Sequence, residues 1–319
     1  MTAPLEPVHS RPMTGGNGFS VVVPAFDRAA TVGRTVASVQ RAADEWAAAT
    51  GGPTEIIVVD DGSSDATATV AGAMAASDAR VRLVRQPNAG VSAARNLGAG
   101  LATGRWLVFL DCDDEVDPRW LVELGAELDA GARLVFAPAH AIGPDGHDEP
   151  WRVAPLGPAF ADVEGLFNPG MFALARADFA AVGGYSTVLT FSENTELAIR
   201  LTQHLGVGKP IRTATIARPL MTIRLTADGT SNADNPEARL RSALYLLDVH
   251  GARLALDPAL SARYWSIAGV AAIRLGRTAL ARRCFTKAAR TDPATAAHLI
   301  RAVAVRVPAL RRRIWSATS

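Results

Sequence analysis

Residues 106–114 read WLVFLDCDD, and this stretch decides which fold the chain adopts. Its first five residues are apolar, which is typical of a short strand buried on both faces of a parallel sheet. Three carboxylates then follow at once, those of Asp111, Asp113 and Asp114. Ligands of open α/β sheets bind at the carboxyl ends of the strands, so we expect a ligand site here.

The three aspartates allow two interpretations. Carboxylates packed this closely repel each other and raise one another's pKa unless a cation lies among them. Mg²⁺ and Mn²⁺ prefer oxygen ligands and usually keep substrate phosphates in their coordination shell. The first interpretation is therefore an Asp-x-Asp site for a metal and a diphosphate. The second is a solvated acidic turn whose aspartate caps the next helix, and the stretch alone does not decide between them.

The preceding sequence alternates strands with helices. Strands are predicted at residues 19–23, where Pro24 ends the strand, and at 55–59 and 81–85, and helices are predicted at 29–48, up to about 77, and at 91–102. This alternation predicts an α/β fold with a mostly parallel sheet, flanked by helices and joined by right-handed crossovers. Acidic residues follow three strand ends, namely Asp27, the pair Asp60 and Asp61, and the pair Asp111 and Asp113. Their convergence at one sheet edge is what a nucleotide site requires.

The remaining sequence predicts a less regular middle and a helical end. Strands are expected near 134–139, 172–176 and 220–225, helices at 177–182 and 190–205, and a loop at 143–158. From about residue 236 the pattern is wholly helical, with helices at 236–255, 258–275, 277–291 and 295–315. We therefore predict a disordered leader (1–18), an α/β domain (19–230) and a helical region (231–319).

Composition excludes several classes of protein. The net charge of the 319 residues is only +2, which argues against a nucleic-acid-binding protein with a clustered basic face. Cys112 and Cys284 offer no metal spacing and no disulfide framework, which fits a cytoplasmic location. No signal peptide or membrane span is recognisable. Any membrane contact is therefore expected to be peripheral, through the last helix with its basic residues 311–313, unless these merely form a solvated helix end.

Glycine-rich phosphate-binding loops are missing. Gly208-Lys209 is followed by Pro210 and lacks the upstream glycine of a P-loop, and no G-x-G-x-x-G follows the first strand. The charge of a bound diphosphate would then have to be neutralised by a metal, which favours the first interpretation of the aspartates.

Four motifs in order complete the picture: FSVVVPAFD at 19–27, EIIVVDDGSSD at 55–65, QPNAGVSAARNLG at 86–98, and FLDCDD at 109–114. Together they resemble the family 2 glycosyltransferases of the GT-A fold, over roughly residues 19–225. The resemblance implies transfer of a sugar, with inversion, from a nucleotide diphospho-sugar to an acceptor hydroxyl on a cell-envelope glycan, a lipid or a small molecule. A UDP-sugar is favoured because UDP is the commonest donor nucleotide among relatives.

The resemblance also implies roles for individual residues. Pro24, Phe26 and Asp27 would border the nucleotide, and Asp60 or Asp61 would accept a hydrogen bond from the imino N–H of the base. Arg95 would lie beside the base or the phosphates. Asp111 would bind the ribose, and Asp113 would bind Mn²⁺ or Mg²⁺, which stabilises the departing diphosphate.

Inversion requires a general base, and here the sequence departs from the family pattern. The base is usually the Asp of a Glu-Asp pair that opens a helix after a Gly-Gly-aromatic turn. In this chain Asn194 stands at that place, and an amide cannot accept the proton. Glu193, ahead of Glu196, is the predicted substitute. The alternative is that both glutamates only complement the dipole of the helix.

A second departure is Thr226, where many relatives have a histidine near the metal or the diphosphate. The two departures motivate an alternative function: a catalytically weak nucleotide-sugar-binding protein whose helical tail recruits partners. A processive synthase is not expected, because its Gln-x-x-Arg-Trp motif and transmembrane helices are both missing.

Overall fold

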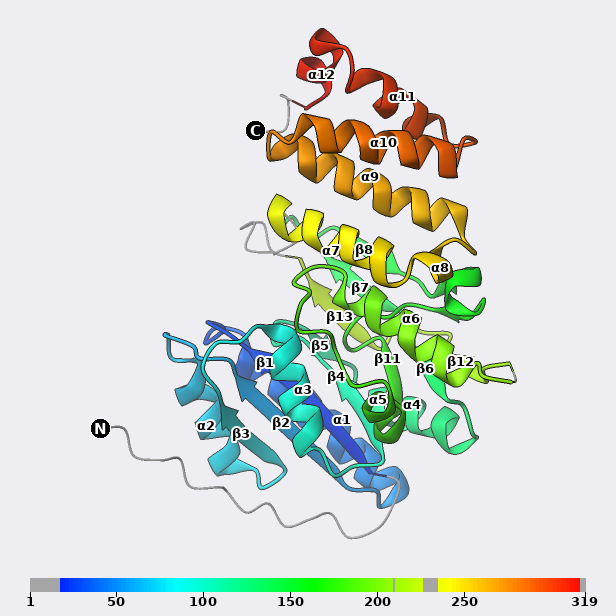
Figure 1. The fold of residues 1–319 in the computed structure, drawn as a ribbon. Coiled ribbons are helices and arrows are strands. Elements are labelled where there is room, and N and C mark those ends of the chain that lie inside the picture. The colour runs from blue at the N-terminus through cyan, green and yellow to red at the C-terminus, as the bar shows by residue number, and fades with distance from the viewer. Residues whose placement is uncertain (1–17, 209, 226–234, 316–319) are drawn as a thin grey trace.

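The computed structural model describes residues 18–208, 210–225 and 235–315 (Figure 1). The predicted leader and Thr226 lie outside them. At the centre is a seven-stranded sheet of order β12-β6-β11-β4-β1-β2-β3. In chain order its strands are β1 (Phe19–Ala25), β2 (Thr54–Asp60), β3 (Val81–Arg85), β4 (Trp106–Phe109), β6 (Leu134–Phe136), β11 (Phe172–Ala175) and β12 (Thr213–Thr215). Only β11 runs antiparallel to its neighbours, which confirms a mostly parallel sheet.

Helices cover both faces of this sheet. Along β1, Val21 and Val23 pack into a core shared with α1 (Val32–Thr50), α2 (Thr67–Ser77) and α4 (Trp120–Asp129). Val22 points the other way, into a core shared with α3 (Val91–Leu101), α5 (Arg176–Ala181) and α6 (Glu193–Leu205). Strand side chains alternate between faces, so burial on both sides explains the unbroken apolar runs of the sequence.

Pro24 does not end the first strand, as we expected it to. The strand continues to Ala25, whose carbonyl accepts a hydrogen bond from the Asp61 N–H of the β2 side. Val22, two residues before Pro24, instead accepts from Leu110 on the β4 side. Pro24 therefore faces the β4 side beyond the last residue paired with β4, and its missing N–H costs no ladder hydrogen bond.

A second sheet, of order β5-β13-β7-β8, lies beside the acidic turn. It consists of β5 (Glu115–Val116), β7 (Ala139–Ile142), β8 (Asp148–Trp151) and β13 (Met221–Arg224). The strand predicted at 134–139 is confirmed over β6 but is wrong as a single strand. β6 and β7 belong to different sheets, and Pro138 between them cannot donate a ladder hydrogen bond. The loop predicted at 143–158 is also wrong in part, because it contains β8. Short elements follow there: β9 (Ala154–Pro155), a 3₁₀ helix (Pro158–Phe160) and β10 (Glu164–Gly165).

The helical region stacks on the same side of the molecule as α6 (Figure 1). Its helices are α7 (Pro236–Val249), α8 (Gly251–Leu254), α9 (Pro258–Arg274), α10 (Thr278–Thr291), α11 (Ala296–Ala304) and α12 (Pro308–Trp315). The helices predicted at 236–255 and 295–315 are each divided into two in the structure. The second division lies just before Pro308, and proline disfavours a helical conformation of the residue in front of it. Among the described helices none is long and apolar enough to cross a membrane.

One apolar cluster joins the helical region to the central sheet. It contains Leu197 and Leu201 of α6, Leu246 of α7 and Phe285 of α10, all fully buried. The boundary predicted at 230/231 lies outside the described residues, between β13 and α7, and the same apolar core includes residues from both sides of that gap. Whether the two parts are separate domains stays a prediction.

Candidate functional site

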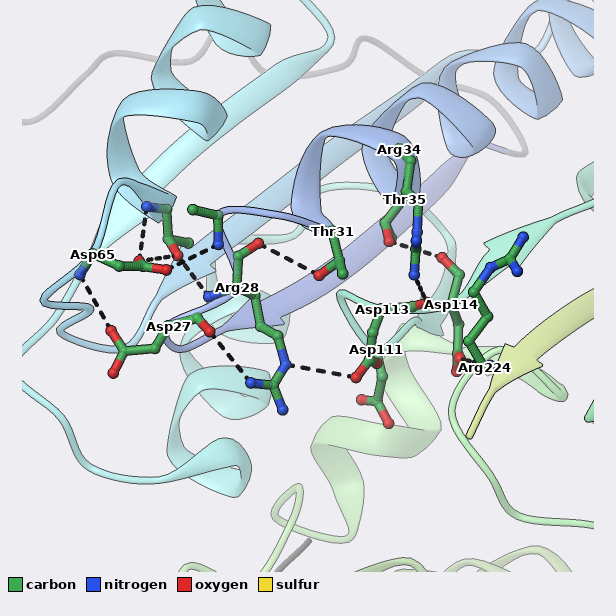
Figure 2. Close-up of polar contacts among 12 residues, drawn as sticks. Asp27, Arg28, Thr31, Arg34, Thr35, Asp65, Asp111, Asp113, Asp114 and Arg224 are labelled. Carbon is green, nitrogen blue, oxygen red and sulfur yellow. Dashed lines mark hydrogen bonds and ion pairs between the residues drawn. The ribbon is translucent and has the colours of Figure 1, made fainter. Parts of the chain in front are cut away.

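The acidic turn after β4 is fastened to the start of α1. The Thr35 hydroxyl donates to the carbonyl of Asp114 at 2.8 Å, and Arg34 Nη2 donates to the carbonyl of Asp113 at 3.1 Å. Figure 2 shows both contacts, with the three carboxylates of the turn in the same view. The side chain of Asp113 takes no part in these two contacts and borders the space between the turn and α1.

That space is a cavity of about 240 Å³. It brings together charged side chains that are far apart in the sequence: Asp27, Arg28, Arg34, Asp65, Asp113 and Arg224. Arg28 reaches across it, with its Nε 3.6 Å from Asp113 Oδ2 (Figure 2). A cavity that alternates guanidinium and carboxylate groups suits a ligand that carries both anionic oxygens and a bound cation.

The carboxylates of the turn are short of positive charge. Burial raises the pKa of Asp113, and Asp111 raises it further, while Arg28 only partly offsets both. Burial, with Asp111 and Asp113 beside it, raises the pKa of Asp114 to about 8. A cation in the turn would relieve this repulsion.

The protein donors of the turn do not by themselves make a complete metal site. No group of three or more His, Cys, Asp or Glu side chains that could hold a metal exists in the described part of the chain. A Mn²⁺ or Mg²⁺ here would therefore be bound by Asp113, with ligand oxygens and water completing its shell, as is usual for Mg²⁺ beside phosphates.

Asp27 ties the ends of β1 and β2 together. Its backbone is left-handed, with φ of 49°, which aspartate tolerates better than most residues. One carboxylate oxygen accepts from the backbone N–H groups of Ser64 at 2.8 Å and Asp65 at 3.3 Å. Next to it Phe26 is 44% exposed, whereas Pro24 is buried. Of these three predicted nucleotide contacts, Phe26 has the most accessible side chain.

Asp60 and Asp61 already have polar partners. Asp60, which is fully buried, accepts from Arg85 Nε at 2.8 Å and from the Ser63 N–H at 3.1 Å. Asp61 accepts from the backbone N–H groups of Ala89 and Gly90, each at 2.8 Å. Both carboxylates therefore shape the loops around the sheet edge. A carboxylate has about four acceptor positions, so neither is saturated, but Asp60 is fully buried and Asp61 is only 4% exposed.

Arg95 connects two of the predicted site residues. Its Nη2 lies 2.7 Å from Asp111 Oδ1, and its Nη1 lies 3.4 Å from Glu193 Oε1. The guanidinium is 5.0 Å from the centre of the Tyr185 ring and almost completely buried. Burial works to lower the pKa of Arg95, but Asp111, Tyr185 and Glu193 raise it, so the cation is stable. One buried cation thus holds the strand-end aspartate and the first residue of α6 together.

The three residues at the start of α6 have different environments. The Glu193 side chain is 15% exposed and paired with Arg95. The Asn194 side-chain oxygen is buried, with no hydrogen-bond partner among the described residues. Glu196 is bound by Arg200 and by His250 Nε2 at 3.0 Å, and it is nearly inaccessible. Glu193 is therefore better placed than Glu196 to meet a ligand.

Three arginines of the cavity were not among the candidates predicted from the sequence: Arg28, Arg34 and Arg224. Arg28 directly follows the first motif, so its position in the sequence could have identified it as a candidate site residue. Arg34 lies in the first turn of α1, a helix whose other residues gave no hint of function. Arg224 depends on the second sheet: its backbone N–H donates to Asp114 Oδ1 at 3.3 Å and its Nε to Glu115 Oε1 at 3.0 Å.

Comparisons with known proteins identify the family. Residues 20–183 match the family described as glycosyl transferase family 2. The chain is 37% identical over 106 residues to the glycosyltransferase YibD of Escherichia coli, covering 33% of this chain and 29% of that protein. It is 37% identical over 131 residues to the succinoglycan biosynthesis protein ExoO of Rhizobium meliloti, covering 39% of this chain and 37% of ExoO.

A solved structure extends the likeness over almost the whole chain. Staphylococcus aureus TarS, in complex with UDP-GlcNAc, superposes with a TM-score of 0.65 over 93% of this chain and 89% of that one. Sequence identity over this superposition is 15%, so the likeness concerns the fold. The chain spans about a third of the length of the two curated relatives.

Proposed function

The chain belongs to glycosyl transferase family 2, and on that premise we propose that it is a metal-dependent, inverting glycosyltransferase. The donor would be a nucleotide diphospho-sugar, with a UDP-sugar favoured, and the acceptor a hydroxyl on a cell-envelope glycan, a lipid or a small molecule. Two comparisons support this reading: TarS, of the same fold, was solved with UDP-GlcNAc, and ExoO is named for succinoglycan biosynthesis.

The donor is proposed to bind along the carboxyl edge of the sheet. Its ribose would meet Asp111, its base the loop of Asp60 and Asp61 beside Phe26, and its diphosphate the cavity of Asp113. Mn²⁺ or Mg²⁺ at Asp113, when bound, supplies positive charge to the departing diphosphate. Arg28, 3.6 Å from Asp113, is positioned to contact the same phosphates.

Glu193 is the proposed general base, and the bridge through Arg95 is the single observation that carries this assignment. An acceptor oxygen attacks the anomeric carbon while Glu193 takes the hydroxyl proton. The bond from that carbon to the diphosphate oxygen breaks on the opposite face, which gives inversion. Arg95 would act as a positioning residue, because it fixes Glu193 relative to Asp111, the ribose ligand.

A weak nucleotide-sugar-binding protein is the second candidate, and the side chain of Asn194 favours it. Its oxygen is buried without a partner among the described residues, at the position where relatives carry a catalytic Asp. In this reading Glu193 only pairs with Arg95, and the helical region recruits partners.

Release of UDP from UDP-GlcNAc, measured with Mn²⁺, Mg²⁺ or EDTA, distinguishes the two candidates. The enzyme hypothesis predicts metal-dependent UDP release, accelerated by an extract of cell-envelope acceptors. Binding of UDP-GlcNAc without release, with any acceptor fraction tried, would support the binding protein instead. GDP- and dTDP-sugars run in parallel would show whether the donor base was assigned correctly.

A further inference from the structure

The helical region contains a second and larger cavity, of about 340 Å³, between α7, α9 and α11. It lies far along the chain from the motifs of the family, and no residue of the proposed nucleotide site lines it. Its polar lining consists of Arg239, Arg263, Arg274 and Arg301, together with His298 and Ser266.

The lining is predominantly cationic, although Asp292 Oδ2, outside the lining, lies 3.7 Å from His298 Nε2. Four guanidinium groups border the cavity, and no carboxylate does. Within residues 18–208, 210–225 and 235–315, none of the four forms an ion pair. Another arginine of this region, Arg277, does pair, with Glu237 at 3.1 Å. Solvent screens the repulsion at the exposed Arg263 and Arg274, but four like charges gathered around one cavity still favour an anion between them.

Arg239 gives independent support for a ligand. Its Nε is buried and has no hydrogen-bond partner among the described residues. The guanidinium stacks on the ring of Phe191, 5.0 Å from the ring centre, which fixes its plane. A buried donor of a charged group is expensive to leave unpaired, and an acceptor oxygen in the cavity would satisfy it.

The floor of the cavity is largely apolar. Ile267 and Val270 line it, and next to them Ser266 and His298 are 4% and 7% exposed. Ser266 Oγ and His298 Nδ1 are 2.8 Å apart, so each already has one polar partner. The volume is at the small end of the range for ligand pockets, about 300 to 1,000 Å³.

We propose that this cavity binds a phosphate ester. Arginine presents a planar fork of donors that matches phosphate oxygens bidentately, and the apolar base accommodates the carbon part of the ester. The ester could be a soluble molecule or the headgroup of an anionic lipid. Ile300 and Val303, which flank Arg301 in the sequence, are each 59% exposed and would face such a lipid.

Calorimetric titration of the full chain with glycerol 3-phosphate tests the proposal, with and without saturating UDP. The parent is expected to bind the ester in both conditions. Arg263→Gln combined with Arg274→Gln should weaken binding about tenfold or more, the usual effect of losing hydrogen bonds to a charged group. The matched control, Arg282→Gln with Arg290→Gln, removes the same charge from positions that are as exposed as Arg263 and Arg274 but lie outside the cavity, and it should bind like the parent.

Sedimentation with vesicles distinguishes the two sources of the ester. Vesicles of phosphatidylglycerol and phosphatidylcholine should retain the parent, but not the Arg263/Arg274 variant, if the ester is a lipid headgroup. If the ester is a soluble molecule, only the titration with glycerol 3-phosphate should detect binding.

The proposal is overturned if the parent binds neither probe, or if the control pair loses binding as much as the cavity pair. UDP affinity, measured on the same samples, keeps this result separate from the proposed transferase activity. It should be equal in all three proteins, because none of the substituted arginines lies near the sheet edge.

Discussion

At the scale of single residues, Asp113 is a carboxylate whose charged form the fold disfavours although its side chain is partly exposed. Its side chain is 28% exposed, yet burial and the neighbouring Asp111 raise its pKa. A bound cation would therefore stabilise the charged form of Asp113. We therefore expect Asp113→Asn to leave the free energy of unfolding unchanged or slightly higher, while weakening UDP binding in Mn²⁺ by about ten- to a hundredfold, as for a lost charged interaction.

Calorimetry with UDP, with and without Mn²⁺, checks this expectation, and Asp145→Asn in the exposed loop before β8 is the matched control. If the Asp113 variant and the parent bind UDP equally well in Mn²⁺, Asp113 is not the metal ligand.

Glu196 differs from Asp113, because the fold stabilises its charged form. Burial acts to raise its pKa, but hydrogen bonds from His250 and Arg200 outweigh burial, so the pKa lies below its ordinary 4.5. A depressed carboxyl pKa gives stability that is present above 4.5 and is lost as pH falls through the folded-state pKa. Glu196→Gln should thus cost about 3 kcal/mol at pH 7, as for one partner removed from a buried pair.

Urea unfolding of the parent and the Glu196→Gln variant at pH 7 and at pH 4 or below is the check. The difference between them should shrink at the lower pH. A constant difference, or a variant as stable as the parent at pH 7, would mean that the network with Arg200 and His250 does not stabilise the protein.

At the scale of elements, the loop after β2 is bound to the segment that leads into α3. Asp61 holds the backbone that leads into α3, and Gly62 adopts a φ of 78° with its α-carbon so close to Asn88 that a Cβ would lie 2.7 Å from the Asn88 nitrogen. Asp61→Asn exchanges an acceptor for a donor facing two N–H groups. It should lower stability by about 1–3 kcal/mol, and lower UDP affinity if this loop reads the base.

Thermal unfolding and UDP titration of the Asp61→Asn variant separate these roles. Reduced stability with unchanged UDP affinity would assign Asp61 to loop structure alone and leave base recognition to Asp60. Unchanged stability would contradict the account of the loop.

Elements with a strong local signal were predicted well from the sequence. The strand ending at Phe109 and the helix from Val91 were placed within a residue or two, because unbroken apolar runs and glycine turns define them locally. The family expected from the four motifs is confirmed by the match over residues 20–183. The second sheet was missed, since it pairs strands such as β5 and β13 that are about a hundred residues apart and only two to four residues long.

The site could be predicted in part, for the same physical reason. Residues that follow strand ends, such as Asp111 and Asp113, converge because parallel strands end at one edge. Arg34 and Arg224 reach the cavity through packing of α1 and of the second sheet, which no local pattern encodes. The roles predicted for Asp60, Asp113 and Glu193 stay predictions.

At the scale of the whole molecule, the helical region is part of the same apolar core as the sheet. Phe285 of α10 and Leu201 of α6 are both fully buried in one cluster. We therefore expect a single cooperative unfolding transition. Phe285→Ala should cost about 3–5 kcal/mol and should lower the midpoint of the entire chain.

Circular dichroism and tryptophan fluorescence report on this together, because Trp46 and Trp120 are buried beside the sheet and Trp265 lies in α9. Coincident transitions in the parent and the variant support one core. Two separated transitions would instead establish independent domains near the predicted boundary.

The central claim is that Glu193, held by Arg95 beside Asp111, is the base of a sugar transfer. The most direct test is the rate of UDP release from UDP-GlcNAc by the parent and by Glu193→Gln, at equal donor occupancy. The account predicts an active parent and a rate lower by about 10²- to 10⁴-fold in the variant, with UDP affinity retained. An active parent whose rate Glu193→Gln leaves unchanged would contradict it, as would a parent without activity in which Asn194→Asp restores transfer.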